Sequence, residues 1–252
     1  EQLSAVDIPP AAILIEPEAR DTAPAILAAA LFLAESDPDG LMLVAPSDHV
    51  IPDAATFNAA VAAGLDAARA GKIVTFGIAP DRPETGFGYL ELETVPETGV
   101  PTALPLQGFV EKPDASRAAQ MLAEGRYLWN AGIFLFSIKT ILDAFRAAQP
   151  EMVEAVRASL DGAKRDLVFT RLEAAPWAKA KAISIDYAVM EKARNLAVVP
   201  YSGRWSDLGD WAAVWRETEA QGMALSGSAT AIDCTNTLLR SEVEGQEVVG
   251  IG

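Results

Sequence analysis

The sequence predicts an α/β fold in which a mixed, mostly parallel sheet is flanked by helices. Three short apolar runs, at 12–16, 41–45 and 72–78, have the length and composition of buried strands. Stretches rich in Ala and Leu, long enough for helices, separate these runs. This alternation of strands and helices predicts parallel strands joined by right-handed crossovers.

Residues at the expected helix ends support this alternation. Thr22 is the predicted N-cap of the first helix, with Pro24 in its first turn. Asp53 is predicted to cap the second helix, which ends at Gly71. The later pattern predicts a strand ending at Glu111, a helix from Asp114 to Gly125, a strand over 133–138, a helical stretch interrupted at Pro150, a helix capped at Ser184 or Asp186, a strand over 196–201 and a helix ending near Gly222.

Two domains are expected. Residues 1–222 form the α/β core, and residues 223–252 begin a small C-terminal β domain, because short polar and apolar alternations replace the helical pattern there. The first residue is Glu rather than Met, and residues 248–252 resemble an unfinished strand. The sequence is therefore expected to be a fragment of a longer protein.

Composition limits the classes of function. A net charge of −15 argues against binding nucleic acid or anionic membranes through general electrostatics. A phosphorylated substrate stays compatible, because a few local cations or a metal can neutralise it. Cys234 is the only cysteine, which excludes an intrachain disulfide and a Cys-rich zinc site. No apolar run reaches the roughly 18 residues of a membrane span, no secretory signal is visible, and the cytoplasm is the expected compartment.

Four polar clusters each lie at the end of a predicted strand. They are Asp48, Glu111–Lys112, Trp129–Asn130 and Asp207. In open parallel sheets, ligands bind just beyond the carboxyl ends of the strands. A carboxylate such as Asp48 could hold a metal or a substrate hydroxyl there, and a lysine such as Lys112 could hold a phosphate.

Each cluster also has a purely structural explanation. Asp48 and Asp207 could cap turns or the helices that follow them, and Asn130 could be a turn residue. Glu111 and Lys112 could form an exposed ion pair, which contributes little to stability. His49 is the only histidine, so a histidine-dependent catalytic pair could lie only there.

The motifs APSDHVI, ETGFGYLE, FVEKP, WNAGIFLF, SIDYAVMEK and WSDLGDW occur in this order. Together they resemble bacterial mannose-1-phosphate guanylyltransferases (GDP-mannose pyrophosphorylases), above all the long form that is often fused to a mannose-6-phosphate isomerase. EPEARDTAPAI resembles the segment before that family's first long helix, with Asp21 where Asn is usual. The resemblance covers essentially the whole chain, and it implies a Rossmann-like nucleotidyltransferase fold of the GT-A type.

The resemblance also implies a reaction, in which GTP and mannose 1-phosphate give GDP-mannose and pyrophosphate. The cofactor it implies is Mg²⁺. The expected partners are GTP, mannose 1-phosphate and GDP-mannose, with a second copy of the chain as a candidate partner and neither nucleic acid nor membrane. The implied site residues are Asp48, Lys112 and Asp207 for catalysis; Asp48 and Asp207 for Mg²⁺; Gly88, Glu111, Lys112 and Asn130 for the sugar 1-phosphate; and Arg20, Thr22 and Ala23 for the nucleotide.

These roles are chemically consistent. The nucleophile is already an anionic phosphate oxygen, so the reaction needs no strong general base. The main obstacle is repulsion between two anions, which a metal ion and cationic side chains overcome while they align the in-line attack. Mg²⁺ prefers one or two carboxylates, with phosphate oxygens and waters completing its shell. Asp48 and Asp207 must therefore come together in space.

The chain departs from the family pattern at both ends. The glycine-rich loop of the type LAGGxGTRLWPLSR, which wraps the triphosphate, is absent, and no glycine precedes Gly40. The isomerase or β-helical portion that normally follows GIG is absent too. Omission of both ends from a longer protein is the favoured explanation. These 252 residues by themselves are expected to bind GTP poorly and to show little or no turnover.

Alternative functions stay open at this point. One is a pyrophosphorylase for another sugar 1-phosphate or another nucleoside triphosphate. A second is a non-catalytic sugar-nucleotide-binding or regulatory protein that has lost its phosphate loop. A third is a metal-dependent glycosyltransferase, which usually carries an Asp-x-Asp pair; Val50 stands two positions after Asp48, which disfavours it.

Overall fold

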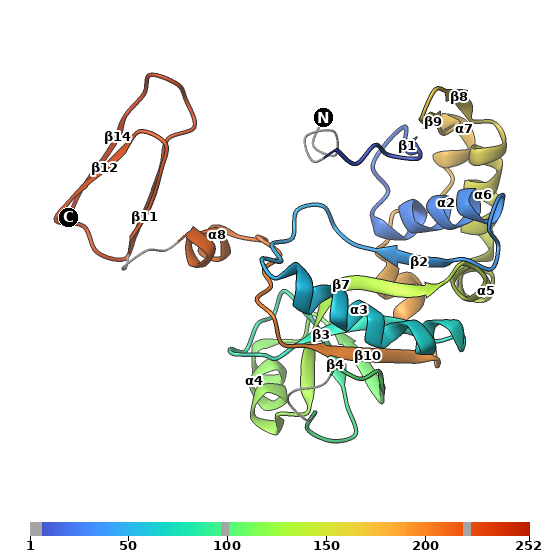
Figure 1. Cartoon of the computed structure of the whole chain (residues 1–252), viewed down its shortest axis with the longest axis horizontal. Coiled ribbons are helices and arrows are strands. Elements are labelled where there is room, and N and C mark those ends of the chain that lie inside the picture. The colour runs from blue at the N-terminus through green and yellow to red at the C-terminus, as the bar shows by residue number, and fades with distance from the viewer. Residues whose placement is uncertain (1–6, 97–100, 219–222) are drawn as a thin grey trace. The chain divides into compact units, whose positions relative to one another are not determined.

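The computed structural model describes residues 7–96, 101–218 and 223–252 (Figure 1). The chain divides into two compact units. The larger is built from Glu1–Pro46 and Ala55–Ser202, and the smaller from Ser47–Ala54 and Gly203–Gly252. The domain boundary predicted at 222 falls on residues outside those described, and it stays a prediction.

A seven-stranded mixed sheet forms the centre of the larger unit, as far as the described residues extend. Its order is β5-β10-β3-β7-β4-β6, and β2 pairs with another part of β7. The α/β class with a mixed sheet between helices is confirmed. The strands are β2 (Leu41–Val44), β3 (Ile73–Ile78), β4 (Gly88–Glu91), β5 (Leu104–Pro105), β6 (Gly108–Glu111), β7 (Tyr127–Ser137) and β10 (Leu196–Tyr201).

The expectation of mostly parallel pairing was wrong. In the described sheet only β3 and β10 pair in parallel; the other pairings are antiparallel. The reason is β7, which lies between β2 and β3 and runs opposite to both (Figure 1). β2 and β3 do run in the same direction, as a strand–helix–strand unit requires, but they are not neighbours. The local pattern determines the direction of strands, and it does not determine which strand comes between them.

The first predicted strand also leaves the main sheet. β1 (Ile13–Ile15) pairs in parallel with β9 (Phe169–Arg171), and β9 pairs antiparallel with β8 (Lys164–Asp166). This small sheet joins the beginning of the chain to a hairpin more than half the chain away. Its strands have three residues each, too short for their pairing partners to be read from the sequence.

The helices of the larger unit begin and end close to the predicted positions. They are α2 (Thr22–Ala34), α3 (Ala54–Arg69), α4 (Ala115–Glu124), α5 (Ile138–Ala148), α6 (Pro150–Asp161), α7 (Ala174–Trp177) and the π-helix η1 (Asp186–Met190). Asp114 caps α4 by accepting from the Arg117 N–H at 2.9 Å, and Gly125 ends it with φ +69°, as predicted. Pro150 begins α6 and so separates it from α5.

Three boundaries differ from the prediction. The N-cap of α2 is Asp21 rather than Thr22, because the Asp21 carboxylate accepts from the Thr22 N–H at 2.7 Å. β7 begins at Tyr127 rather than 133, because the polar Asn130 is paired within the strand instead of forming a turn. The segment after Ser184 forms a π-helix with no side-chain cap rather than a capped α-helix, because the Glu191 N–H bonds the carbonyl of Asp186.

Helices cover both faces of the main sheet. On one face α3 packs so closely that a Cβ added to Gly64 would lie 3.2 Å from both Val74 and Leu135. α4 covers the same face further along β7, over Trp129. On the opposite face α2, α5 and α6 pack together around Phe134 and neighbouring apolar residues, which form the main core.

The smaller unit contains α8 (Trp211–Thr218) and four strands, as far as it is described. These are β11 (Met223–Ser226), β12 (Ala229–Ile232), β13 (Thr237–Arg240) and β14 (Val248–Ile251). β11 pairs in parallel with β13, and β12 with β14, so successive strand pairs stack as two turns of a coil. The small β element expected after position 223 is therefore present, whereas the helix end predicted near Gly222 lies outside the described residues. Among the described helices, none combines the length and apolarity that crossing a bilayer requires.

The core of the larger unit gives a direct stability test. Leu27 of α2 is fully buried, whereas Leu167, in the turn between β8 and β9, is 94% exposed. We expect Leu27→Ala to lower the free energy of unfolding by about 2–5 kcal/mol, because it leaves a cavity. The matched Leu167→Ala change should alter it by less than about 0.5 kcal/mol. Urea unfolding of both variants measures the difference, and equal losses would contradict this description of the core.

Candidate active site

Glu111, Gly88 and Asn130 lie in one row across three strands of the main sheet. The β4–β6 pairing puts Gly88 opposite Glu111. Tyr89 pairs with Trp129, so the next residues along these antiparallel strands bring Gly88 beside Asn130. A Cβ added to Gly88 would lie 2.5 Å from Glu111 Oε2, so the Glu111 carboxylate lies directly over the glycine. The structure thus brings three of the predicted sugar-site residues together on one face.

Asn130 is held by hydrogen bonds from both sides. Its Oδ1 accepts from the Thr75 hydroxyl at 2.7 Å and from the Gly132 N–H at 3.3 Å. Its Nδ2 donates to Asp186 Oδ1 at 2.9 Å. Since Asn130 is 9% exposed and Thr75 is fully buried, these bonds satisfy polar groups that would otherwise be costly to bury.

Lys112 follows Glu111 with an unusual backbone. Its φ is +47°, in the left-handed region that a lysine seldom adopts, and the buried Pro113 comes next. The Lys112 ammonium lies 3.3 Å from Glu111 Oε1. The Lys112 side chain is 55% exposed, whereas that of Glu111 is 8% exposed. The ammonium can therefore reach a ligand while it still pairs with the buried carboxylate.

Burial and neighbouring charges perturb all three ionisable groups in this region. Burial raises the pKa of Glu111, the Glu191 charge adds to this, and Lys112 opposes it. Burial alone would lower the pKa of Lys112, but the hydrogen bond and charge of Glu111 outweigh it and raise that pKa. Burial and the charge of Glu111 raise the pKa of Asp186 to about 6, against the opposing hydrogen bonds and the charge of Lys112. The carboxyl groups of Glu111 and Asp186 thus both interact with the Lys112 ammonium in a partly buried site.

Asp186 is the residue that the sequence analysis missed. In the sequence, the motif SIDYAVMEK predicts only a helix cap at this aspartate. The structure instead turns the Asp186 carboxylate toward Asn130, Glu111 and Lys112. The sequence does contain one signal for this role: Asp186 lies between the apolar Ile185 and the apolar run 188–190, all of which are buried in the structure.

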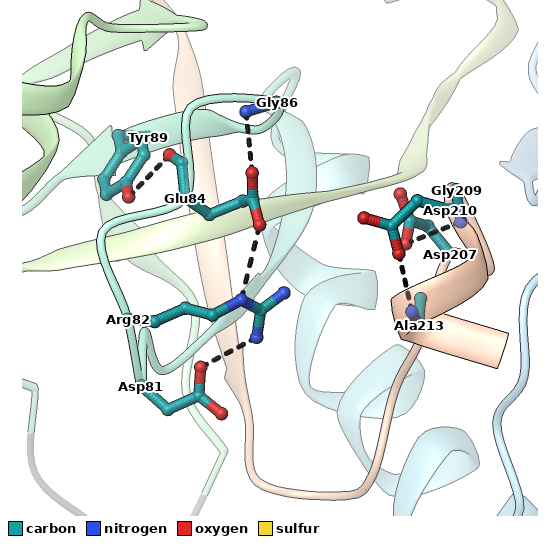
Figure 2. A network of polar contacts seen from close by, with 9 residues as sticks. All are labelled: Asp81, Arg82, Glu84, Gly86, Tyr89, Asp207, Gly209, Asp210 and Ala213. Atoms are coloured by element: carbon teal, nitrogen blue, oxygen red, sulfur yellow. Dashed lines mark hydrogen bonds and ion pairs between the residues drawn. The ribbon is translucent and has the colours of Figure 1, made fainter. Parts of the chain in front are cut away.

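The loop before Gly88 is held by its own polar contacts. Figure 2 shows the Glu84 carboxylate between the Gly86 N–H, at 3.0 Å, and Arg82 Nε, at 3.3 Å. Arg82 also pairs with Asp81 at 2.9 Å, and its guanidinium lies 4.8 Å from the Trp129 ring centroid. The Tyr89 hydroxyl donates to the carbonyl of Glu84 at 2.9 Å. These contacts fix the approach of the chain to Gly88.

In the smaller unit, Asp48 and Asp207 both lie near His49. Val50 and Ser206 exchange backbone hydrogen bonds of 2.8 and 3.1 Å. Continuing this antiparallel register brings Asp207 opposite His49, next to Asp48. Burial lowers the pKa of His49, and the charges of Asp48 and Asp207 both oppose that shift, so both carboxylates act on one imidazole.

The structural explanation for Asp207 as a helix cap does not hold. Asp210 Oδ1 accepts from the Ala213 N–H at 2.6 Å and so caps α8 (Figure 2). Asp207 instead accepts from the Gly209 N–H at 3.2 Å, which leaves its other oxygen for further contacts. The described residues contain no group of three or more His, Cys, Asp or Glu side chains that could hold a metal by themselves. A metal here would rely on the two aspartates and on non-protein ligands.

The three predicted nucleotide-site residues lie at the start of α2. Arg20 pairs with Glu18 and donates to the carbonyl of Ala180 at 3.1 Å. The Thr22 hydroxyl accepts from the Ile185 N–H at 2.9 Å. The N–H of the fully buried Ala23 donates to the carbonyl of residue 183 at 3.1 Å. These residues therefore hold the segment that leads into η1 and Asp186.

Comparison with known proteins gives consistent matches. A family model described as nucleotidyl transferase matches residues 2–222. The chain is 46% identical to the xanthan biosynthesis protein XanB of Xanthomonas campestris over 94% of its length, and 41% identical to the mannose-1-phosphate guanylyltransferase of Sinorhizobium fredii over its whole length. It is 37% identical to the alginate biosynthesis protein AlgA of Pseudomonas aeruginosa, again over its whole length. These alignments cover 50%, 49% and 52% of the relatives, so the chain spans about half their length.

Solved structures agree with this result. A Thermus thermophilus structure titled mannose-1-phosphate geranyltransferase is 33% identical with a TM-score of 0.77, and the match covers 94% of this chain and 67% of that one. A Helicobacter pylori structure titled mannose-6-phosphate isomerase is 28% identical with a TM-score of 0.69, over 77% of this chain and 73% of that one.

The buried Thr75–Asn130 hydrogen bond can be tested through stability. We expect Thr75→Val to lower the free energy of unfolding by about 1–3 kcal/mol, because it removes a donor to a buried amide oxygen and keeps the side-chain shape. Thr102 is exposed and provides the matched Thr102→Val control. Urea unfolding of the two variants checks this, and equal losses would mean that the hydroxyl contributes nothing specific.

Proposed function

Because the chain belongs to the nucleotidyl transferase family, we propose that it transfers a guanylyl group from GTP to mannose 1-phosphate, giving GDP-mannose and pyrophosphate. Relatives named mannose-1-phosphate guanylyltransferase support this choice of substrates. In this reaction an oxygen of the sugar phosphate attacks the α-phosphorus of GTP. The bond from that phosphorus to the β-phosphate oxygen breaks, and pyrophosphate leaves with the electron pair.

The observation that carries this proposal is the row of Glu111, Gly88 and Asn130 with Lys112 at its end. A buried carboxylate and a buried amide offer an acceptor and a donor to sugar hydroxyls. The glycine between them leaves room for the Glu111 carboxylate to lie against the sheet, where a side chain at position 88 would displace it. The exposed ammonium of Lys112 provides a positive charge for the sugar phosphate.

Asp48 and Asp207 are the proposed Mg²⁺ ligands. Two neighbouring carboxylates with no third protein ligand suit a Mg²⁺ ion that takes its remaining ligands from phosphate oxygens and water. When bound, such an ion neutralises phosphate charge and holds the reacting phosphate in line. The Gly209 N–H, which donates to Asp207 Oδ1, keeps that carboxylate in a fixed orientation.

For the nucleotide we propose the start of α2, with Arg20, Thr22 and Ala23. The Arg20 guanidinium already pairs with Glu18, so it gains less from a phosphate than a free cation would. The division into a 1–222 core and a C-terminal β domain stays a prediction, as do the homodimer and the cytoplasmic location.

The direct test is pyrophosphate release by the full chain, with any residues that the natural protein carries beyond positions 1 and 252. We expect GTP with mannose 1-phosphate, in the presence of Mg²⁺, to give the highest kcat/KM among the four common nucleoside triphosphates, each paired with mannose 1-phosphate and with glucose 1-phosphate. Lys112→Ala should lower kcat/KM at least about tenfold, because a charge-assisted contact to the phosphate is lost. Lys164→Ala, an exposed lysine on β8, is the control.

Each other outcome supports a different function. A maximum with another sugar or nucleotide would replace the substrates and keep the reaction. No pyrophosphate from any pair would favour the non-catalytic binding alternative.

The close approach of the Glu111 carboxylate to Gly88 gives a separate prediction. We expect Gly88→Ala to weaken binding of mannose 1-phosphate about tenfold, because the new methyl group would displace the Glu111 carboxylate and would lie 2.9 Å from Phe109 Cζ. Gly86→Ala is the matched control, since its Cβ would meet only the Glu84 side chain, at 3.4 Å. Isothermal titration of both variants with mannose 1-phosphate measures the effect. Similar affinities would exclude a sugar that binds the Glu111 carboxylate.

A further inference from the structure

Asp186 belongs to a motif to which the proposed function assigns no role. It begins η1, a short π-helix, and its carboxylate accepts from Asn130 Nδ2 at 2.9 Å. Two contacts from α2 hold the segment that leads to Asp186. The Thr22 hydroxyl accepts from the Ile185 N–H, and the Ala23 N–H donates to the carbonyl of Ile183. The position of Asp186 is thus set by residues distant in sequence.

The hydrogen bonds of Asn130 have a fixed direction. An amide has two acceptor sites on oxygen and two N–H donors on nitrogen. Thr75 and Gly132 occupy both sites on Oδ1, and Asp186 takes one N–H. Within the described residues, no protein acceptor is found for the second N–H. The strand register places the Asn130 side chain on the face that Glu111 and Gly88 share.

We infer that Asp186 is a positioning residue for the sugar 1-phosphate, which acts by holding the Asn130 amide with its N–H toward the ligand. Asn130 then acts as a donor and Glu111 as an acceptor, one on each side of Gly88. This pair is complementary to neighbouring sugar hydroxyls, one of which accepts while the other donates. The inference rests on the proposed function, since it takes a sugar 1-phosphate as the ligand.

Loss of Asp186 leaves the amide without its charged acceptor. The oxygen of Asn130 is still held by Thr75, but the nitrogen is not held, and the amide can rotate toward the Glu111 carboxylate. The Asn130 N–H that would donate to the ligand then donates to Glu111 instead. Affinity for the sugar falls while the Lys112 contact to the phosphate is kept.

The charges around Asp186 add a pH dependence. The charged groups that act on it are Glu111 of β6 and the next residue, Lys112. α5 also packs on η1, and the neutral Gln149 that follows α5 donates to the carbonyl of Ala188. Burial and Glu111 raise the pKa of Asp186 to about 6. Below that pH the protonated carboxyl becomes a donor itself and no longer requires the Asn130 N–H, so the KM for the sugar should rise as the pH falls from 7 to 5.

The test compares three variants of the full chain with wild type, using GTP and mannose 1-phosphate. Asp186→Ala is expected to raise the KM for mannose 1-phosphate about tenfold, with the KM for GTP and kcat changed less than about threefold. Asp186→Asn is uncharged and carries a donor, like the protonated carboxyl, so at pH 7 its KM for mannose 1-phosphate should match the raised KM of wild type at pH 5, and that KM should not change between pH 7 and 5. Asp66→Asn, on the exposed face of α3, is the control.

Thermal unfolding separates this role from a merely structural one. The pKa of Asp186 is about 6 in the folded state and near 3.8 in the unfolded state. As the pH rises from about 4 to above 6, the folded protein must therefore accept a buried negative charge, which lowers the free energy of unfolding. Asp186→Asn should therefore be at least as stable as wild type at pH 8, and this advantage should shrink toward pH 4. A loss of stability in both variants, with the wild-type KM and pH profile retained, would overturn the inference.

The outcomes distinguish the two proposals. If wild type makes GDP-mannose and Asp186→Ala keeps the KM for mannose 1-phosphate, only the inference fails. If wild type makes none, calorimetric titration with mannose 1-phosphate decides: binding that Asp186→Ala weakens about tenfold supports the inference without the reaction, and absence of binding to wild type overturns both.

Discussion

The structure of the site depends on one buried amide. Asn130 lies inside β7, the strand that pairs with β2, β3 and β4, and a polar side chain there must find its hydrogen bonds inside the protein. Thr75 on β3 and Asp186 on η1 supply them. Because these partners come from different elements, the amide links the sheet to the segment that packs over it. The pairing register of β4 with β7 and with β6 then places Gly88 and Glu111 beside Asn130.

The electrostatic environment of Glu111 and Asp186 suits them to bind a ligand that donates hydrogen bonds, although burying them costs stability. Two partly buried carboxyls, Glu111 and Asp186, compete for the charge of Lys112. Burial raises both pKa values, the Glu191 charge adds to the shift of Glu111, and the Glu111 charge adds to that of Asp186. Poorly hydrated carboxyls of this kind favour a ligand that donates hydrogen bonds, as sugar hydroxyls do. The left-handed backbone of Lys112 is consistent with this, since such strain persists only where the surrounding structure imposes it.

Much of the fold could be predicted from the sequence, because caps and breaks are local. Asp114 and Gly125 bound α4, and Pro150 separates α5 from α6, as their side chains or backbone preferences require. The strand order could not be predicted, because an apolar run says that a strand is buried without naming its neighbours; β7 therefore separates β2 from β3. For the site, the end of a predicted strand correctly indicates Glu111. Asn130 is also placed at a strand end by its sequence but lies inside β7, and Asp186 resembles an ordinary helix cap. Only the three-dimensional contact with Asn130 distinguishes it.

Overall charge and local charge act in opposite directions in this protein. A net charge of −15 repels the anions that the proposed reaction uses, so general electrostatics cannot bring them to the protein. Recognition must then come from short-range groups, which in the proposed site are the exposed Lys112, oriented N–H donors and the Mg²⁺ ion proposed at Asp48 and Asp207. Short-range groups work only when their directions are fixed. This is why the residues that hold Asn130 and Lys112 in place matter as much to the site as those that touch the substrate.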